Sequence, residues 1–401
     1  MLRTAPALGI LAGLAAAALH FAGALKSTPA VAALPFDVTL LATLGLLALL
    51  PLILAGRRWD LAPGIGLPLA ACGALWLWWI IASLWSPWTG GVAERLPQIV
   101  VIGPVMLVAG LVVGGDPSAR RVFPGAILAL GAFVALSVAW GLAVDAVVLG
   151  GQVGADPSRT RVQYQVAGLA IACAAAVAAL RMTAARGLPA LAWLLLLGAL
   201  CAAVLLPGGR AALGAAAATV TLAPALRWVL QRRLATALGW LTLVPLVGAL
   251  GLALLLLDPE RAGQLATLDR LTRATGGAES ARHLLWAEAW RLSGWAGLGP
   301  GGFPPAAGLG QDRGMHPHNH AIEALVEGGA VGLILWLAAF GGGALFMLTR
   351  LTRVAPERAA MVVALTLPIA MTAMVSTDLG NRMVWFGLGL ALSLGIEARR
   401  A

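Results

Sequence analysis

The chain has 401 residues, of which 60% are hydrophobic and only 11% are charged. Because a water-soluble domain carries about 25% charged residues, this composition excludes a soluble globular enzyme and predicts an integral membrane protein. The net charge of +10 does not indicate nucleic-acid binding, since the basic residues occur in ones, twos and threes between apolar runs, as loop charges do in membrane proteins.

A helix that crosses the hydrocarbon core needs about 20 apolar residues, and the sequence contains about twelve such runs. We therefore predict an all-α, polytopic integral membrane protein. The N-terminal run resembles a signal peptide, but many spans follow, so we interpret it as an uncleaved first transmembrane helix. The cysteines lie inside these runs without metal-binding spacing and are interpreted as buried hydrophobic residues. The predicted spans cover residues 6–25, 34–55, 64–84, 97–115, 122–144, 164–181, 188–206, 211–230, 235–257, 321–349, 358–377 and 381–396.

The charges of the connecting loops predict the orientation of these spans. With the N-terminus in the cytoplasm, the inner connections hold 15 basic and four acidic residues, whereas the outer connections hold 12 basic and 13 acidic residues. This bias predicts that both termini are cytoplasmic. We divide the chain into an N-terminal bundle of about nine spans (1–257), one long outer loop (258–320) and a C-terminal part of about three spans (321–401).

The long outer loop is too large to be structureless in a compact protein. Between Glu279 and Trp295 its apolar residues recur with the period of an amphipathic helix, which we expect to lie in the outer membrane interface. The glycines and prolines from Gly297 to Pro305 predict the end of this helix.

Three arginines are predicted at the outer ends of helices: Arg161, Arg210 and Arg282. Each alone could be an anchor whose charged head reaches the interface. Together they favour a site for phosphate or pyrophosphate, which guanidinium groups bind in a bidentate manner. Gln165 follows the single tyrosine, Tyr164, at the mouth of a helix in the same outer region.

Three of the five histidines alternate in the outer segment His316-Pro317-His318-Asn319-His320. Imidazole is the side chain best suited to accept a proton near neutral pH. A metal site is an alternative, although the usual set of carboxylate or thiolate ligands is lacking. Another alternative is a purely structural role, in which Asn319 caps the following helix.

Glu323 and Glu327 share one face of the helix that follows. A carboxylate buried in a membrane span is costly and is usually paired, so these two residues are expected either to bind an outer arginine or to orient a histidine. Gly329-x-x-Gly332 on the same helix predicts close approach of another helix.

These motifs resemble the O-antigen ligase and polymerase superfamily (Wzy_C-like). His318-Asn319, followed after nine residues by Gly329-x-x-Gly332, is similar to the family signature. The resemblance includes Arg282-x-x-x-Trp286, the segment Gly297-Leu-Gly-Pro-Gly-Gly-Phe303 and Gly209-Arg210-Ala211, and it covers roughly residues 160–345. The sequence departs from the family at Gln163-Tyr164-Gln165, where an asparagine is frequent.

The resemblance implies a metal-independent, inverting glycosyltransferase with a GT-C-like architecture in the bacterial inner membrane. Such an enzyme takes a glycan from undecaprenyl pyrophosphate at the periplasmic face, and no cofactor or metal is expected. His318 is expected to act as the base, and Arg210 and Arg282 are expected to stabilise the pyrophosphate. The residues expected to bind substrate are Arg161, Gln165, Trp286, His316, Asn319, His320, Glu323 and Glu327, with structural roles for Gly329 and Gly332.

Four functions fit the pattern to different degrees. An O-antigen ligase, which transfers the glycan to lipid A-core, is preferred to an O-antigen or exopolysaccharide polymerase, which transfers it to another carrier-linked repeat. A secondary transporter fits the number of spans, but its polar groups are expected in the middle of the membrane rather than at the outer mouth. A structural membrane protein would not need the arginines and histidines.

Overall fold

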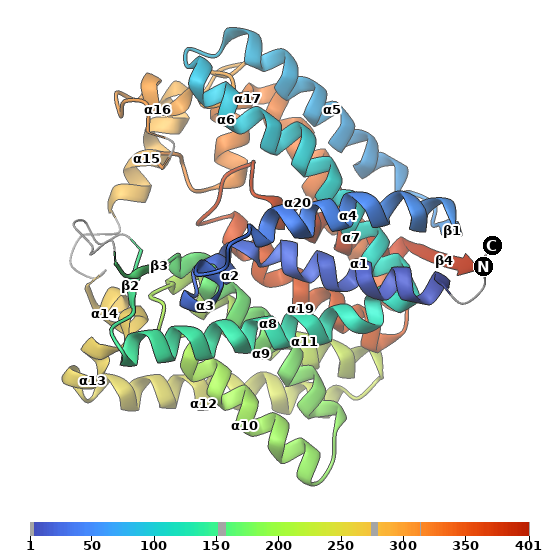
Figure 1. Ribbon diagram of the computed structural model, residues 1–401, viewed down its shortest axis with the longest axis vertical. Helices are drawn as coiled ribbons and strands as arrows, with labels where there is room; N and C mark the ends of the chain where they lie inside the picture. The colour runs from blue at the N-terminus through green and yellow to red at the C-terminus, as the bar shows by residue number, and fades with distance from the viewer. Residues whose placement is uncertain (1–3, 151–157, 274–279, 313, 401) are drawn as a thin grey trace.

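The computed structural model describes residues 4–150, 158–273, 280–312 and 314–400 as a bundle of long helices with two short β ribbons (Figure 1). The α-helices are α1 (Thr4–His20), α2 (Ala22–Lys26), α3 (Pro29–Ala32), α4 (Val38–Ala55), α5 (Gly66–Ala82), α6 (Thr89–Pro97), α7 (Gly103–Gly115), α8 (Pro117–Ala143), α9 (Tyr164–Ala184), α10 (Leu188–Ala203), α11 (Arg210–Leu230), α12 (Leu234–Leu256), α13 (Pro259–Gln264), α14 (Ala266–Arg273), α15 (Ser280–Leu292), α16 (Phe303–Ala306), α17 (His320–Trp336), α18 (Gly342–Arg350), α19 (Pro356–Ala373) and α20 (Arg382–Leu392). The strands are β1 (Arg57–Leu61), β2 (Val147–Leu149), β3 (Thr160–Val162) and β4 (Ile396–Arg400).

Among the described residues, eight helical segments are long and apolar enough to cross a membrane, and three further apolar helices are shorter. The chain is therefore a mostly helical, multi-pass membrane protein, as predicted. The predicted span 97–115 is part of a longer helix, because a π-helical turn (Gln98–Ile102) joins α6 to α7 without a break. The total of twelve spans stays a prediction, since the segment predicted at 358–377 corresponds to α19, which is not among the eight.

Helix α9 lies at the centre of the bundle and packs against α8, α10, α11 and α19. All its residues from Ala167 to Leu180 are buried, and most of them are alanine. Small side chains allow helices to approach closely where lipid offers no hydrophobic driving force. By contrast, α12 exposes leucines along its length, which suits a helix that faces lipid.

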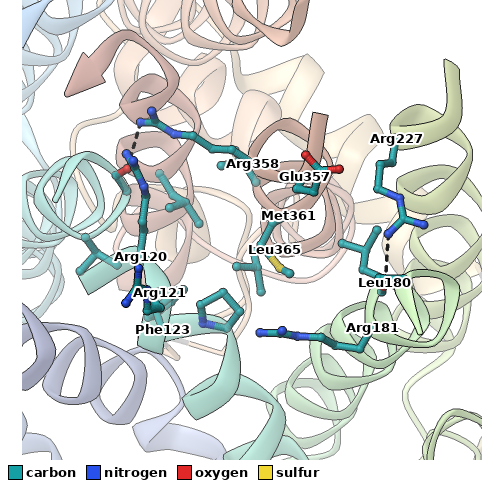
Figure 2. A pocket seen from close by; sticks show the side chains of 16 residues that line it. Arg120, Arg121, Phe123, Leu180, Arg181, Arg227, Glu357, Arg358, Met361 and Leu365 are labelled. Atoms are coloured by element: carbon teal, nitrogen blue, oxygen red, sulfur yellow. Dashed lines mark hydrogen bonds between the residues drawn. The ribbon is translucent and has the colours of Figure 1, made fainter. Parts of the chain in front are cut away.

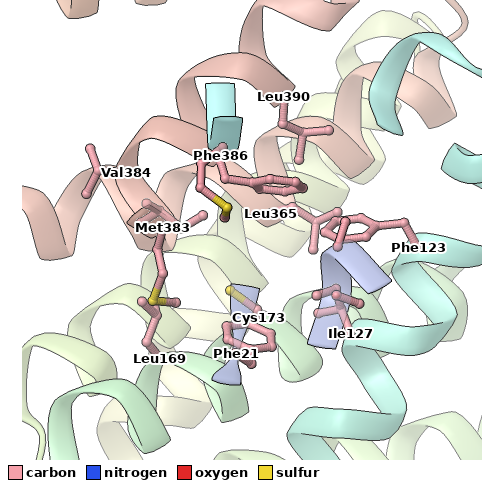
Figure 3. Close-up of a cluster of buried hydrophobic side chains, with 14 of the residues drawn as sticks. Phe21, Phe123, Ile127, Leu169, Cys173, Leu365, Met383, Val384, Phe386 and Leu390 are labelled. Carbon is pink, nitrogen blue, oxygen red and sulfur yellow. The ribbon is translucent and has the colours of Figure 1, made fainter. Parts of the chain in front are cut away.

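Aromatic and aliphatic side chains together fill the space between α1, α8, α9 and α20 (Figure 3). Phe123 and Phe386 lie 5.3 Å apart between ring centroids, and Cys173 is buried in the same cluster (Figure 3). The environment of Cys173 agrees with the interpretation of this cysteine as a buried hydrophobic residue.

Two β ribbons depart from the all-α prediction. Strands β1 and β4 pair antiparallel, and β2 and β3 pair parallel. The first ribbon is charged: Arg399 forms an ion pair with Asp60, and Glu397 accepts two hydrogen bonds from Arg120. The strands β1 and β4 are charged, and β2 and β3 are only three residues long, so none of them shows the apolar alternation by which a strand is predicted from sequence.

The two ends of the bundle differ. The N- and C-termini lie together beside β1 and β4 (Figure 1). The first residues of α9 and α11, which the sequence pattern assigned to the catalytic region, line a cavity next to α14 and α15. Helices α14 and α15 lie at the opposite end of the bundle from the termini (Figure 1). Which end faces the periplasm stays a prediction.

Candidate active site

A cavity of about 400 Å³ lies where α9 and α11 begin, and we call it the arginine cavity. Arg210, the first residue of α11, and Arg282, in the first turn of α15, both line it. Gln165 of α9 contributes to the same wall. The fold therefore brings together three predicted site residues that are far apart along the chain.

Arg270 of α14 also lines the arginine cavity, and we did not predict it. Its guanidinium donates hydrogen bonds to the carbonyl oxygens of Gly208 (3.4 Å) and Gly150 (3.2 Å) and lies 4.1 Å from the ring centroid of Tyr164. Gly208 has a φ of 95°, which glycine adopts without steric cost. Arg270 thus holds the turn that places Arg210, and as one of several basic residues in the long loop it gave no distinctive sequence signal.

The arginine cavity has the electrostatics of an anion site. Burial lowers the pKa of Arg282, the neighbouring charge of Arg210 lowers it further, and Tyr164 acts in the opposite direction. An arginine nevertheless keeps its proton in proteins, so two positive charges remain close together. Asp269 is the only acid among the described residues that line the cavity. Such a group of guanidiniums is well suited to a phosphate or pyrophosphate.

His318 lies in the segment before α17 and has a φ of 55°, in the left-handed region. Its backbone N–H donates a hydrogen bond to Nδ1 of His316 at 3.1 Å, and the two rings are 4.0 Å apart between centroids. The Nδ1 atom of His318 is buried and has no hydrogen-bond partner in the part of the chain that the structure describes. A non-glycine residue in this backbone region is uncommon and is enriched at functional sites.

The surroundings of His318 favour its neutral form. Burial lowers the pKa of His318, the charge of Arg282 lowers it further, and Asp378 acts in the opposite direction. A lowered pKa leaves the imidazole unprotonated at neutral pH, which is the form that can accept a proton. The influence of Arg282 also places His318 within electrostatic range of the arginine cavity.

A second cavity, of about 610 Å³, adjoins the first, and we call it the histidine cavity because His316 lines it. Asp378, in the connection between α19 and α20, and Arg382, the first residue of α20, line it as well. We did not predict these two residues: Asp378 stands in the short connection between the last two predicted spans, and Arg382 stands at the start of the last one. The residues that line both cavities are Gln165, Thr372 and Ser376.

Glu323 and Glu327 bind Arg95 of α6. The guanidinium donates to Glu323 at 2.5 Å and to Glu327 at 2.7 Å, and it lies 3.7 Å from a carboxylate oxygen of Asp378. The side chains of Arg95 and both glutamates are at most 4% exposed. From the sequence we expected either an arginine or a histidine as the partner of these glutamates. The partner is an arginine, Arg95, which is not one of the three predicted outer arginines.

The remaining oxygens of the two glutamates tie α17 to distant segments. Glu327 accepts a hydrogen bond from the backbone N–H of Gly301 at 3.0 Å, and Glu323 accepts one from Leu379 at 3.0 Å. Neither glutamate is among the lining residues of the two cavities. Their predicted contact with substrate stays a prediction, whereas their visible contacts hold α6, α17 and the connection after α19 together.

Gly329 interrupts α17, with φ 70° and ψ −169°. The backbone from Gly294 to Gly299 runs against this interruption: Ala330 N–H donates to the carbonyl of Gly294 (3.0 Å), and Gly299 N–H donates to that of Glu327 (2.8 Å). A Cβ at Gly329 would collide with the backbone of Trp295 and Gly297. The close neighbour of Gly329 is thus a loop, whereas we expected a helix.

Gly332 does face a helix. A Cβ on it would lie 3.5 Å from the indole nitrogen of Trp78 in α5, which is an ordinary contact, but only 2.7 Å from the carbonyl oxygen of Ala324, in the part of α17 before the interruption. The indole nitrogen of Trp78 donates to the carbonyl of Gly328 at 2.7 Å. Of the two glycines in the motif, Gly329 therefore allows a loop to approach, and Gly332 allows the two parts of the interrupted helix α17 to pack closely, with α5 in ordinary contact.

Three other predicted residues have structural partners. Asn319 caps α17 by accepting hydrogen bonds from the N–H groups of Ala321 and Ile322. His320 is fully buried, with Nε2 at 2.9 Å from the carbonyl of Asp378 and Nδ1 accepting from Trp336 at 3.1 Å. Trp286 donates to the carbonyl of Pro317 at 2.7 Å, next to His318. The capping role considered for Asn319 is present, and direct substrate contact of these residues stays a prediction.

Arg161 is the one predicted arginine that does not line the arginine cavity. It is exposed on β3 and is not among the lining residues of either cavity. Within the described ranges, no group of three or more His, Cys, Asp or Glu has an arrangement that could hold a metal. A metal-independent reaction stays a prediction.

The comparisons with known proteins bear on the same region. Residues 193–337 match the family model Wzy_C, described as O-Antigen ligase. The matched range contains Arg210, Arg282 and His318, as well as the interrupted helix α17. A search of curated proteins found no match to the chain. The chain is therefore a multi-pass membrane protein whose residues 193–337 are similar to the O-antigen ligase family, and this match supports a glycosyltransferase-like enzyme.

Proposed function

We propose that the chain transfers a glycan from undecaprenyl pyrophosphate to a sugar hydroxyl, as an O-antigen ligase with lipid A-core as the acceptor. The observation that carries this proposal is that Arg210 and Arg282 line the arginine cavity together, while His318 lies beside both cavities without lining either. The charge of Arg282 acts on His318, and the ring of His318 lies 4.0 Å from that of His316, which lines the histidine cavity. Arg210, Arg282 and His318 come from three distant segments, and all three lie inside the family match.

In this proposal the arginine cavity holds the pyrophosphate of the donor. Arg210 and Arg282 bind its oxygens, and Arg270 keeps the turn before Arg210 in place. During transfer, negative charge grows on the leaving pyrophosphate as its bond to the anomeric carbon breaks. Guanidiniums fixed around that position stabilise the transition state more than the ground state. The guanidiniums also supply positive charge to the leaving pyrophosphate, a role that a metal ion has in many other enzymes that act on phosphates.

The histidine cavity is proposed to receive the acceptor sugar. The acceptor hydroxyl attacks the anomeric carbon from the face opposite the pyrophosphate, so the configuration inverts, and its proton passes to His318. The lowered pKa of His318 suits this role, because the imidazole is neutral before the reaction. Gln165, Thr372 and Ser376 form the wall common to both cavities and would border the transferred sugar.

The buried Arg95 network has a positioning role in this mechanism. Asp378 lines the histidine cavity and lies 3.7 Å from Arg95, which in turn binds Glu323 and Glu327 of α17. His318 immediately precedes α17. We therefore propose that the network fixes the distance between His318 and the connection after α19.

A polymerase would use the same arrangement with a carrier-linked repeat as acceptor, so the two functions are separated by their products in cells. Deletion of a ligase leaves long, unligated polymer on the carrier lipid, whereas deletion of a polymerase leaves single repeats. We expect long carrier-linked polymer in the deletion strain of the source bacterium. Accumulation of single repeats would contradict the ligase assignment while leaving glycan transfer in place.

A further inference from the structure

A third cavity, of about 340 Å³, lies at the end of the bundle opposite the candidate active site, and we call it the basic pocket. It is lined by residues of α8, α9, α11 and α19. Gln165 near the start of α9 lines the active-site cavities, while Arg181 near its end lines the basic pocket. A helix rises about 1.5 Å per residue, so the two sites are about 24 Å apart.

The basic pocket combines a charged rim with an apolar floor. Figure 2 shows Arg120 and Arg121 on one side and Arg181 and Arg227 on the other, with Arg181 extending into the pocket. Arg358 completes the five lining arginines, and Glu357 is the only acid among the described lining residues. The floor is formed by Phe123, Leu180, Met361, Val362, Leu365 and Leu390.

Most of these arginines have protein partners. Arg120 binds Glu397 at 2.7 Å, and Arg358 binds the same carboxylate at 2.5 Å. Arg227 donates to the carbonyl oxygens at the end of α9, while its Nε stays buried without a partner in the described chain. These contacts fix one part of the rim.

Arg121 and Arg181 differ from the other three. Both are exposed, and within the described residues neither forms a hydrogen bond or an ion pair with the protein. In the predicted topology, all five arginines lie in loops on the inner side of the membrane. That position alone does not require them to line one cavity. Two uncompensated guanidiniums above an apolar floor are complementary to a molecule with a phosphate group and a hydrocarbon part.

We propose that the basic pocket binds the headgroup of an anionic phospholipid. Arg121 and Arg181 contact its phosphate, and the apolar floor receives the first part of an acyl chain. A soluble anion would use the arginines but gain nothing from the floor. The pocket lies at the ends of membrane-spanning helices, which is the depth of lipid headgroups.

The test uses the full chain, purified in a neutral detergent and stripped of lipid, then titrated with phosphatidylglycerol or phosphatidylcholine. Bound lipid is counted by native mass spectrometry. Each basic residue near an anionic headgroup contributes about 1 kcal/mol, so the double variant R121Q/R181Q should bind phosphatidylglycerol about 25-fold more weakly, which corresponds to about 2 kcal/mol. The wild type should prefer phosphatidylglycerol to phosphatidylcholine.

The matched control is R186Q/R233Q, which removes two exposed arginines at the same end that do not line the pocket. It should bind phosphatidylglycerol like the wild type. An equal loss in this control would show non-specific attraction and overturn the proposal, as would equal binding of the two lipids. The single variants R121Q and R181Q, each expected to weaken binding about fivefold, test the same contact if the double variant does not fold.

A second arm separates a lipid headgroup from a soluble anion. Inorganic phosphate at millimolar concentration is added in place of lipid, and the thermal unfolding midpoint is recorded. Phosphatidylglycerol should raise the midpoint and phosphate should not. An equal rise with phosphate alone would overturn the lipid assignment.

Discussion

At the scale of single residues, His318 shows what sequence spacing can and cannot predict. Its distance from Gly329 and Gly332 singled it out among three alternating histidines. The structure adds physical differences between them: His320 has a partner at each ring nitrogen, whereas the Nδ1 of His318 is buried without one in the described chain. Its φ of 55° and its lowered pKa depend on segments distant in sequence, so neither could be inferred from the motif.

The pH dependence of transfer should report the surroundings of His318. Because its pKa is lowered, the acidic fall in activity should occur below the range of an ordinary imidazole. Arg282→Gln removes a charge that lowers this pKa, so the fall should move to higher pH. Asp378→Asn removes a charge that raises it, so the fall should move to lower pH. Rates are measured from pH 4 to 9 at saturating donor; shifts in the same direction in both variants would contradict the assignment.

We did not predict a role for Arg95. It stands just before the apolar run 97–115, so it is expected to lie in the connection outside that span. The structure continues the helix through Arg95 and neutralises it with Glu323 and Glu327. The two glutamates indicated that a partner must exist, but nothing in the sequence paired them with a residue more than two hundred positions away.

Arg95→Ala leaves two buried carboxylates without their cation, which typically costs about 3–5 kcal/mol. We therefore expect a large fall in the thermal unfolding midpoint of the purified protein. Arg291→Ala is the matched control, since Arg291 pairs with Glu288 on an exposed face of α15, where an ion pair contributes about 0–1 kcal/mol. Similar midpoints for both variants would show that the Arg95 network does not stabilise the fold.

At the scale of elements, helix α15 and the interrupted helix α17 form the active-site end together. The sequence predicted a helix from Glu279 to Trp295, and the structure has α15 at Ser280–Leu292, with Glu279 outside the described residues. Exposed Leu284 and Trp290 agree with the predicted interfacial position. The interruption at Gly329 could not be predicted, because it depends on hydrogen bonds from a loop that precedes α17 in sequence.

Gly329→Ala should test that interruption. The φ and ψ of Gly329 lie in a region that is essentially restricted to glycine, and a side chain there would strain the backbone by about 2–3 kcal/mol. We expect a lower unfolding midpoint and a loss of transfer, because the loop from Gly294 to Gly299 would be displaced. Gly248→Ala in α12, where a Cβ meets no atom within 4 Å, should leave the midpoint unchanged or raise it slightly. An unchanged Gly329→Ala protein would contradict the structural role.

At the scale of the whole molecule, composition and periodicity predicted the class of the protein and most of its spans. They could not predict the β1–β4 ribbon, which is charged and joins segments from the two halves of the chain. Composition and periodicity also could not predict which helices pack against α9. Apolar runs have similar sequences, and the choice of neighbouring helices depends on the sizes of the side chains along each helix face. The arginines at the outer helix ends were predicted as a group, and Arg210 and Arg282 do share a cavity, but Arg161 does not.

The central claim is that Arg210 and Arg282 bind the pyrophosphate of a lipid-linked donor while His318 accepts the proton of the acceptor hydroxyl in the same transfer. The most direct measurement is glycan transfer by the purified full chain in proteoliposomes that contain undecaprenyl-pyrophosphate-linked glycan and lipid A-core. His318→Ala should slow transfer about 10²–10⁴-fold, and Arg210→Ala or Arg282→Ala about 10²–10³-fold, while the exposed Arg291→Ala keeps the wild-type rate. Transfer at the wild-type rate by correctly folded His318→Ala protein would contradict the claim.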